Sequence, residues 1–359
     1  MAPRIVRASL RCYGPDRNCR QSRQAGDRVR PVIAVALDEG LRELFFTPQQ
    51  WSALEAAAEL RVCGIAPDAM ARALADAEVV ITGWRTPRLH GGLLAAAPRL
   101  ALVAHTGAAV RFLVGDEVFG RGIRVTQTGA AMAPPVAEVS LTFTLALLHG
   151  LHRHDHALRG GGNWDEAKQH KAPAHELRGS VIGVVGASRT GRAYLHMLSA
   201  LGAVPLLHDP TCDEAAAERL GAELVPLDDL LRRSRIVALH APAIPETRHL
   251  LGRRELALLP DGAGLVNTAR SALVDSAALL AELRTGRIDA ALDVFDEEPL
   301  PTTSPLRTLP NVLLSPHEAA GTTEARRRQG QIVVDEITRH LTGEKLQHEV
   351  TPDIMAISA

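Results

Sequence analysis

The amino-acid sequence predicts an α/β fold built on parallel β-sheets, and three observations lead to this prediction. Short apolar runs alternate with helical patterns along most of the chain, as expected for βαβ units. The length of 359 residues suggests two domains, at about 150 residues per domain. A turn containing two glycines joins an apolar run to a helical stretch from Val181 onward, where a second series of runs begins.

The first series of runs follows an N-terminal stretch without periodicity. We expect residues 1–30 to be a disordered extension, with an arm that binds nucleic acid as the alternative. Thr47 to Gln50 predicts the start of a helix, because these residues offer an N-cap hydroxyl, a first-turn proline and a capping-box glutamine. The expected strands of this series are Pro31–Leu37, Val79–Thr82, Leu100–Ala104 and Ile123–Thr126.

Pro134 and Pro135 are expected to open a long helix from Val136 to about Arg159, since proline suits a first helical turn. The second series has expected strands at Val181–Val185, Val204–His208, Ile236–His240, Gly264–Asn267, Ala290–Val294 and Val312–Ser315. Asp275 and Gly286 frame one helix between them. A final helix is expected from about Thr322 to Leu341.

Composition excludes several classes of protein. Forty basic and 41 acidic residues give a formal net charge of -1, which removes the electrostatic argument for a nucleic-acid partner. The longest apolar stretch, Val136 to Leu148, is shorter than the roughly 18 residues that a membrane span needs. The cysteines show no metal-type or redox spacing, and no apolar segment follows the Arg-rich start as in a signal peptide. We therefore expect a cytoplasmic protein that binds neither nucleic acid nor membrane.

The turn after Val181–Val185 has the pattern of a dinucleotide-binding loop. Gly186 permits the tight turn, Gly191 permits close packing of helix on strand, and the helix N-terminus offers N–H groups to a pyrophosphate. Ser188 stands where such loops usually have their middle glycine, and its Cβ atom hinders the approach of the backbone to the pyrophosphate. The alternative interpretation of this segment is therefore an ordinary tight turn that binds no cofactor. Asp209 ends the next expected strand, where a carboxylate accepts hydrogen bonds from ribose hydroxyls and repels a 2′-phosphate. This pattern favours NAD over NADP.

Polar residues follow three later strands of the same series. Arg270 comes after Gly264–Asn267, Glu298 after Ala290–Val294 and His317 after Val312–Ser315. Ligands of open α/β sheets bind at the carboxyl ends of the strands. The three side chains are therefore candidates for one active site.

At this point the sequence resembles the D-isomer-specific 2-hydroxyacid dehydrogenase family, including its phosphoglycerate dehydrogenase-like and hydroxypyruvate or glyoxylate reductase-like branches. The matching segments occur in the family's order: Pro135–Val139, Gly186–Gly191 with Asp209, His240–Thr247, Asn267–Arg270, Leu292–Leu300 and Ser315–His317. The resemblance implies two Rossmann-like, doubly wound parallel-sheet domains with the active site in the interdomain cleft. It implies a substrate domain of residues 31–133 plus 319–345 and an NAD-binding domain of residues 134–318.

The resemblance also implies roles that the chemistry supports. His317 would give a proton to the developing alkoxide while the nicotinamide supplies a hydride. Glu298 would orient the imidazole and favour its charged form, and Arg270 would bind the substrate's carboxylate and carbonyl oxygen. The implied cofactor contacts are Arg189 and Thr190 at the pyrophosphate, Pro242 and Thr247 beside the adenosine, and Thr268, Ala269 and Asp293 beside the nicotinamide.

In the first domain, the resemblance implies that backbone N–H groups of Thr106, Gly107 and Ala108 bind the substrate carboxylate. The pattern departs from the family at Arg111, for which we expect a surface position. The Arg326 to Arg328 run is interpreted as a solvated helix face. A homodimer through the helix 136–158 is also expected, because family members usually pair there and this helix is apolar on more than one side.

Two other interpretations were weighed. Four histidines cluster near the end of the long helix, His149, His152, His154 and His156, but the implied mechanism needs no metal and we expect none. A non-enzymatic NAD(H)-sensing scaffold, similar to a corepressor, is the alternative function, and the complete set of Arg270, Glu298 and His317 argues against it. The sequence does not identify the 2-hydroxy acid.

Overall fold

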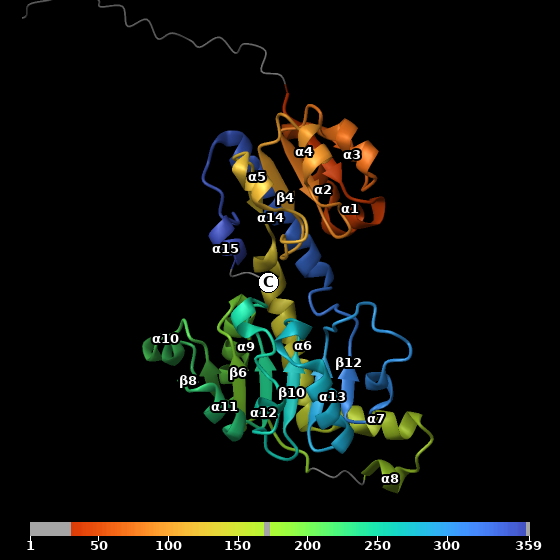
Figure 1. The fold of residues 1–359 in the computed structure, drawn as a ribbon, viewed down its shortest axis with the longest axis vertical. Coiled ribbons are helices and arrows are strands. Elements are labelled where there is room, and N and C mark those ends of the chain that lie inside the picture. Colours follow the sequence, from red (N-terminus) through yellow and green to blue (C-terminus); the bar gives the residue numbers. More distant parts are fainter. Residues whose placement is uncertain (1–29, 169–172, 357–359) are drawn as a thin grey trace, which may run out of the picture. The chain divides into compact units, whose positions relative to one another are not determined.

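Two parallel β-sheets organise the chain from Pro31 onward (Figure 1). This computed structural model describes residues 30–168 and 173–356, so the extension predicted over residues 1–30 lies outside them except for Arg30. Within the described residues one sheet has five strands in the order β2-β1-β3-β4-β5, and the other has seven in the order β12-β11-β10-β9-β6-β7-β8. Neighbouring strands in both sheets pair in parallel, which confirms the predicted α/β class.

The five-stranded sheet is formed by the first series of runs. Its strands are β1 (Val32–Ala36), β2 (Glu59–Val62), β3 (Val79–Thr82), β4 (Leu102–His105) and β5 (Arg124–Thr126). The helices between them are α1 (Glu39–Phe45), α2 (Pro48–Ala57), α3 (Pro67–Leu74), α4 (Gly91–Ala95) and α5 (Asp116–Gly120). The predicted capping box is present, since Thr47 Oγ1 accepts from Gln50 N–H and Gln50 Oε1 accepts from Thr47 N–H. Strand β2 was not predicted, because this edge strand carries polar, partly exposed residues.

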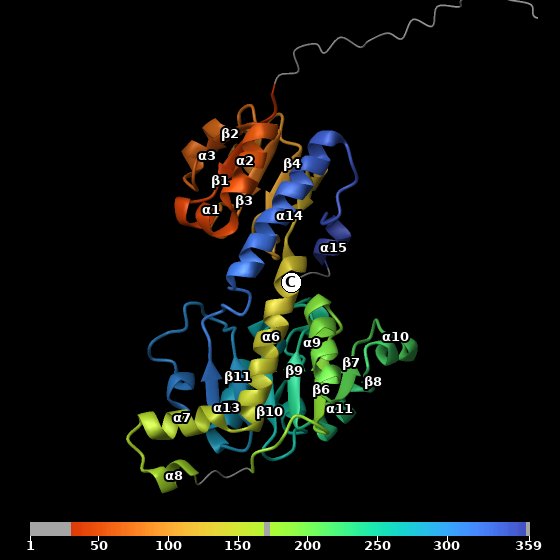
Figure 2. The same ribbon diagram turned by 180° about the vertical axis from the view of Figure 1, so that it is seen from behind.

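The C-terminal part of the chain returns to this sheet. Helix α14 (Thr323–Thr342) lies along this sheet (Figure 2). Its Val333, Val334 and Ile337 belong to the same apolar cluster as Ile33 and Val35 of β1. Beyond it, Val350 N–H donates to the Val125 carbonyl at 2.7 Å, so the segment reaches further than residue 345 before the short helix α15 (Pro352–Ala356).

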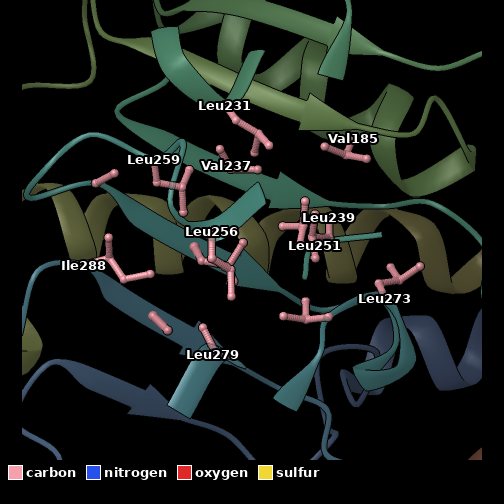
Figure 3. Close-up of a cluster of buried hydrophobic side chains, with 14 of the residues drawn as sticks. Val185, Leu231, Val237, Leu239, Leu251, Leu256, Leu259, Leu273, Leu279 and Ile288 are labelled. Carbon is pink, nitrogen blue, oxygen red and sulfur yellow. The ribbon is translucent and has the colours of Figure 1, made fainter. Parts of the chain in front are cut away.

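The seven-stranded sheet contains the second series. Its strands are β6 (Val181–Val185), β7 (Val204–His208), β8 (Glu223–Leu224), β9 (Ile236–Leu239), β10 (Gly264–Asn267), β11 (Asp289–Leu292) and β12 (Val312–Leu314). Its helices are α9 (Arg189–Ala200), α10 (Glu214–Arg219), α11 (Leu227–Arg233), α12 (Arg253–Leu256) and α13 (Ser276–Thr285), with 3₁₀ turns η1 (Pro245–Thr247), η2 (Ser271–Leu273) and η3 (Pro305–Thr308). Figure 3 shows one of its apolar clusters, where Leu239 of the sheet meets Leu251 and Leu256.

The prediction of one long helix from Val136 to Arg159 is wrong. Helix α6 starts earlier, at Gly129, and ends at Leu148, while α7 covers Leu151–Arg159 and the short α8 covers Trp164–Lys168. Gly150 lies between α6 and α7 in the left-handed region, with φ of 64°, and breaks the helix. The prolines are inside α6, and the Ala131 carbonyl that Pro135 leaves without its helical donor accepts from Arg328 Nη2 at 3.4 Å.

Helix α6 is apolar because much of its surface packs against other elements of the same chain. With its earlier start the helix has 20 residues and is long and apolar enough to cross a membrane by length and composition, contrary to the expectation from Val136 to Leu148 alone. However, 56% of its most apolar window is buried, and it packs against α9, α14 and β10. Packing within the chain thus accounts for a large part of the apolar character of α6.

Candidate active site

The loop after β6, residues 186–191, brings two segments of backbone into close contact, and we call it the phosphate loop. Gly186 has φ of 100°, and a Cβ atom there would lie 2.5 Å from the Ala241 nitrogen. A Cβ atom at Gly191 would lie 2.1 Å from the Gly186 carbonyl oxygen. Both glycines are therefore required by the close approach of backbone that the sequence predicted.

Ser188 is the N-cap residue of α9. Its Oγ accepts a hydrogen bond from Gly191 N–H at 3.3 Å, so the side chain that replaces the usual glycine satisfies one free donor of the helix. The N–H groups of Arg189 and Thr190 have no hydrogen-bond partner among the described residues. The start of α9 thus keeps two donors for an anion such as a pyrophosphate.

Asp209 follows β7 and is tied to the phosphate loop. Its Oδ2 accepts from Ala187 N–H at 2.7 Å, and its Oδ1 accepts from the backbone and hydroxyl of Thr211 at 2.8 and 2.6 Å. Partial burial opposes ionisation, but the hydrogen bonds from Thr211 and Ala187 outweigh it and lower the pKa of the carboxyl. A charged carboxylate is therefore held beside the loop, as a ribose-binding acid requires.

The remaining predicted cofactor residues lie at the same end of the seven-stranded sheet, after β9 and β10. Thr247 Oγ1 donates to the Pro242 carbonyl at 2.5 Å and closes the loop after β9. Thr268 is buried and its hydroxyl lies 2.7 Å from that of Ser140, which joins the loop after β10 to α6. Ala269, next to it, is partly buried.

Arg270 is held by a residue that the sequence analysis did not single out. Asn267 Nδ2 donates to the Arg270 carbonyl at 2.9 Å, while its Oδ1 accepts from Ala269 N–H at 3.1 Å. The side chain of this buried asparagine therefore fixes the loop that carries the arginine. Burial lowers the pKa of the Arg270 guanidinium, and the nearby carboxylate of Glu298 opposes this effect.

Glu298 and His317 form a direct pair. His317 Nδ1 lies 2.7 Å from Glu298 Oε2, and the other carboxylate oxygen accepts from Phe295 N–H at 2.9 Å. The two side chains keep 47% and 36% of their surface exposed, so the imidazole remains accessible to a small molecule. The structure thus pairs two of the three residues predicted from separate strand ends, while Arg270 feels the Glu298 carboxylate electrostatically and donates from Nη1 to the Ala269 carbonyl at 2.6 Å.

Asp293 is buried and supports the loop that carries His317. One of its oxygens accepts from Glu318 N–H at 3.1 Å and also contacts the Ser315 hydroxyl, and the other accepts from Ala319 N–H at 3.1 Å. Residues 315–319, the His317 loop, are therefore clamped by a carboxylate from the neighbouring strand end. The sequence analysis expected Asp293 beside the nicotinamide, and that contact remains a prediction.

Thr106, Gly107 and Ala108, the substrate loop, follow β4 in the five-stranded sheet. The Thr106 carbonyl accepts from Thr128 Oγ1 at 2.6 Å and from the buried amide of Gln329 at 2.7 Å. Of the three N–H groups expected to bind the substrate, that of Thr106 is not available, because it donates to the Thr82 carbonyl at 2.9 Å within the sheet. The N–H groups of Gly107 and Ala108 have no partner among the residues that the structure describes. Gln329 belongs to α14 and was not predicted, since a glutamine in a polar helix gives no signal of burial.

The structure also places the arginines and the histidine cluster that the sequence analysis considered. Arg111 is exposed, as expected, and its Nη2 donates to the carbonyls of Met355 and Ala356 at the end of α15. Arg326 is buried rather than solvated. In the described ranges no group of three histidine, cysteine or acidic residues could hold a metal ion, and His152 of the predicted cluster lies 3.2 Å from Asp289 instead.

Comparison with known proteins gives the family. Residues 141–319 match the family described as D-isomer specific 2-hydroxyacid dehydrogenase, NAD binding domain. The chain is 35% identical over 277 residues to a glyoxylate reductase from Aeropyrum pernix, a match covering 76% of this chain and 82% of that one. The chain belongs to the D-isomer-specific 2-hydroxyacid dehydrogenases. The cofactor of its matched domain is NAD.

Other family members support the same assignment. A D-3-phosphoglycerate dehydrogenase from Methanocaldococcus jannaschii is 34% identical over 300 residues, 83% of this chain but only 56% of that one. The chain thus spans little more than half the length of that relative. A solved phosphoglycerate oxidoreductase from Rhizobium etli is 30% identical and superposes with a TM-score of 0.72, covering 90% of this chain and 99% of that one.

Proposed function

We propose that this member of the family is an NAD-dependent oxidoreductase that interconverts a 2-oxo acid and its D-2-hydroxy acid. The observation that carries the proposal is the 2.7 Å contact between His317 and Glu298, with the buried Arg270 guanidinium within the electrostatic reach of the same carboxylate. An accessible imidazole with an acidic partner and a buried guanidinium nearby is the set that reduction of a charged keto acid needs. An NAD(H)-sensing scaffold has no use for all three groups.

His317 acts as general acid in reduction and general base in oxidation. Its Nδ1 faces Glu298, so Nε2 is the atom that gives a proton to the carbonyl oxygen or takes it back. The carboxylate fixes the ring's orientation and stabilises the imidazolium by opposite charge. The bond from Phe295 N–H holds that carboxylate in turn.

Arg270 binds the substrate's carboxylate and carbonyl oxygen. Its planar fork offers paired charged donors, and partial burial strengthens their interaction with a developing alkoxide. The free N–H groups of Gly107 and Ala108 are the second set of donors for the substrate carboxylate. Groups that follow strands of the two sheets thereby share the carboxylate of a small acid.

The residues around the phosphate loop fit a dinucleotide. The two glycines leave room that a Cβ atom would fill, the first N–H groups of α9 are unpaired among the described residues, and Asp209 supplies a charged carboxylate. When bound, the reduced nicotinamide supplies the hydride. Thr268, Ala269 and Asp293 would hold that end of the cofactor, with Arg189 and Thr190 at the pyrophosphate and Pro242 and Thr247 beside the adenosine.

We also propose a cytoplasmic homodimer, with a substrate domain of residues 31–133 plus 319–345 and an NAD domain of residues 134–318. The expected interface spans residues 136–158, which cover most of α6 and nearly all of α7. Leu151 and Leu158 on α7 and Trp164 on α8 keep about half or more of their surface exposed and support pairing there. Light scattering of Leu151→Ser/Leu158→Ser should then report a monomer.

A substrate screen tests the activity. NADH oxidation is followed with glyoxylate, hydroxypyruvate, pyruvate, phenylpyruvate and branched 2-oxo acids, and repeated with NADPH. His317→Ala and Arg270→Ala should each lower kcat/KM by at least about 100-fold, with the Kd for NADH unchanged. His156→Ala and Arg232→Ala, at exposed positions away from the site, are the controls. Full activity of His317→Ala would refute the acid assignment.

A further inference from the structure

The substrate loop is bordered by neutral polar atoms without partners. His105 is almost fully buried, with Nδ1 3.1 Å from Thr82 Oγ1, while its Nε2 has no hydrogen-bond partner in the described structure. Burial lowers the pKa of this imidazole to about 4, so it is uncharged at neutral pH. The hydroxyl of the adjacent Thr106 is also buried and unpaired there. Buried polar atoms normally have partners, so these two atoms point to a ligand.

Trp84 completes this border from the loop after β3. A Cβ atom at Gly107 would lie 2.7 Å from His105 Nε2 and 3.5 Å from Trp84 Nε1, so both ring nitrogens face the space that the glycine leaves. The indole is 36% exposed, and its N–H has no acceptor among the described residues. Phe112 lies edge-on to the His105 ring, with centroids 5.7 Å apart, and is 45% exposed. The substrate loop is therefore bordered by aromatic rings, and the polar atoms that these rings offer are uncharged.

A chain of contacts connects Trp84 to the His317 loop. The guanidinium of Arg326 lies over the Trp84 ring, 5.2 Å from its centroid, and donates to Glu318 Oε2 at 2.8 Å. Glu318 directly follows His317 in the sequence. One arginine side chain thus separates the indole from the residue next to the proposed acid.

The arginines around this border are already engaged. Arg326 is buried and paired with Glu318, and Arg85 pairs with Asp38. Arg111 donates to the end of α15. A phosphate dianion placed here would meet an indole and a neutral imidazole in place of free cations, and burying an unpaired charge is costly.

We propose that Trp84 and His105 select an unphosphorylated 3-hydroxy-2-oxo acid, with the indole N–H donating to the substrate's hydroxyl. The inference rests on the proposed function and adds the substrate class. Several relatives are named D-3-phosphoglycerate dehydrogenase, and the proposal gives this chain a different, unphosphorylated substrate. Hydroxypyruvate is the simplest such acid, and its 3-phosphate ester is the matched compound that differs only in the phosphate.

The first test compares these two compounds. The kcat/KM for hydroxypyruvate should exceed that for 3-phosphohydroxypyruvate by at least about 100-fold. As a readout independent of turnover, calorimetry on the enzyme with NAD⁺ should show D-glycerate binding more tightly than D-3-phosphoglycerate. Equal or reversed preferences would overturn this inference and leave the oxidoreductase intact. A chain that reduces no 2-oxo acid would refute the proposed function, and this inference with it.

Variants at Trp84 test the residue itself. Trp84→Phe keeps an aromatic ring but removes the donor, and should lower kcat/KM for hydroxypyruvate about tenfold while leaving that for glyoxylate, which lacks C3, unchanged. Trp84→Arg should raise kcat/KM for 3-phosphohydroxypyruvate by at least about tenfold. Trp51→Phe, which removes an indole N–H bonded to Glu55 on α2, is the matched control and should change neither. Equal losses with both substrates in Trp84→Phe would show a structural role and overturn the assignment.

Discussion

The phosphate loop and the His317 loop both follow strands of the seven-stranded sheet, yet they are held in different ways. The phosphate loop is shaped partly by its own residues, through the Gly191–Gly186 contact and the Ser188 cap, and is braced from outside by Asp209, which accepts from Ala187 N–H. The His317 loop is held by Asp293, whose bonds to Glu318 and Ala319 span 25 and 26 residues. His317 itself has φ of 57°, a left-handed conformation that a non-glycine residue keeps only with support from its surroundings.

Because the two loops are held in different ways, cofactor binding and the proton-transfer step depend on different parts of the structure. In the phosphate loop, the contacts that set the first N–H groups of α9 lie within residues 186–191, so the anion site depends less on the rest of the sheet edge. A loop clamped from another strand places its histidine only when the whole sheet edge has formed. Changes to the first loop should therefore affect NADH binding, and changes to the clamp should affect turnover.

The largest effect is expected at the glycine contact. In Gly191→Ala the new Cβ atom would lie 2.1 Å from a backbone oxygen that cannot move cheaply, so the Kd for NADH should rise about 100-fold and the Tm should fall. Fluorescence titration and thermal unfolding measure both. Gly40→Ala, where the nearest side-chain atom is 3.8 Å away, is the control. Unchanged NADH binding in a folded Gly191→Ala protein would contradict the local model of this loop.

The clamp is tested by Asp293→Asn. An amide can accept on one side only, so either the bond from Ala319 N–H or the bonds from Glu318 N–H and the Ser315 hydroxyl lose their acceptor, and His317 shifts. We expect kcat to fall about 30-fold, with the Kd for NADH changed less than about threefold. Ser315→Ala removes only the hydroxyl contact and should cost less. If instead the Kd for NADH rises and kcat is retained, Asp293 acts mainly on the cofactor.

Asp209 should set cofactor choice. Asp209→Asn removes the charge that repels a 2′-phosphate, so the preference for NADH over NADPH should fall about tenfold. Because the pKa of Asp209 is lowered below its usual range, the carboxylate stays charged at pH 5 and the wild-type preference should be the same at pH 5 and pH 7. Kd values for both cofactors at the two pH values check this. A preference that weakens at pH 5 would contradict it.

The smallest effect is expected at Ser188. Ser188→Gly frees the Gly191 N–H for the pyrophosphate, so NADH should bind about two- to threefold more tightly at a small cost in Tm. Weaker binding would show that the serine hydroxyl itself contacts the cofactor.

The fold and the candidate residues were largely accessible from sequence because their signals are contiguous. Buried parallel strands are short apolar runs, and Gly186 to Gly191 is one uninterrupted motif. The edge strands β2 and β8 were missed because their residues are polar or partly exposed. The long helix was misjudged because prolines usually start helices, whereas here Arg328, far along the chain, supports one of the carbonyls that the prolines free.

The sequence by itself indicated the family and the parallel sheets, and it singled out Arg270, Glu298 and His317 as candidates for the active site. Only the tertiary structure revealed how these groups are held: Asn267 behind Arg270, Asp293 behind the His317 loop and Gln329 behind the substrate loop. The physical reason is that buried polar groups must find partners, and these partners come from strand ends and helices that meet only after folding.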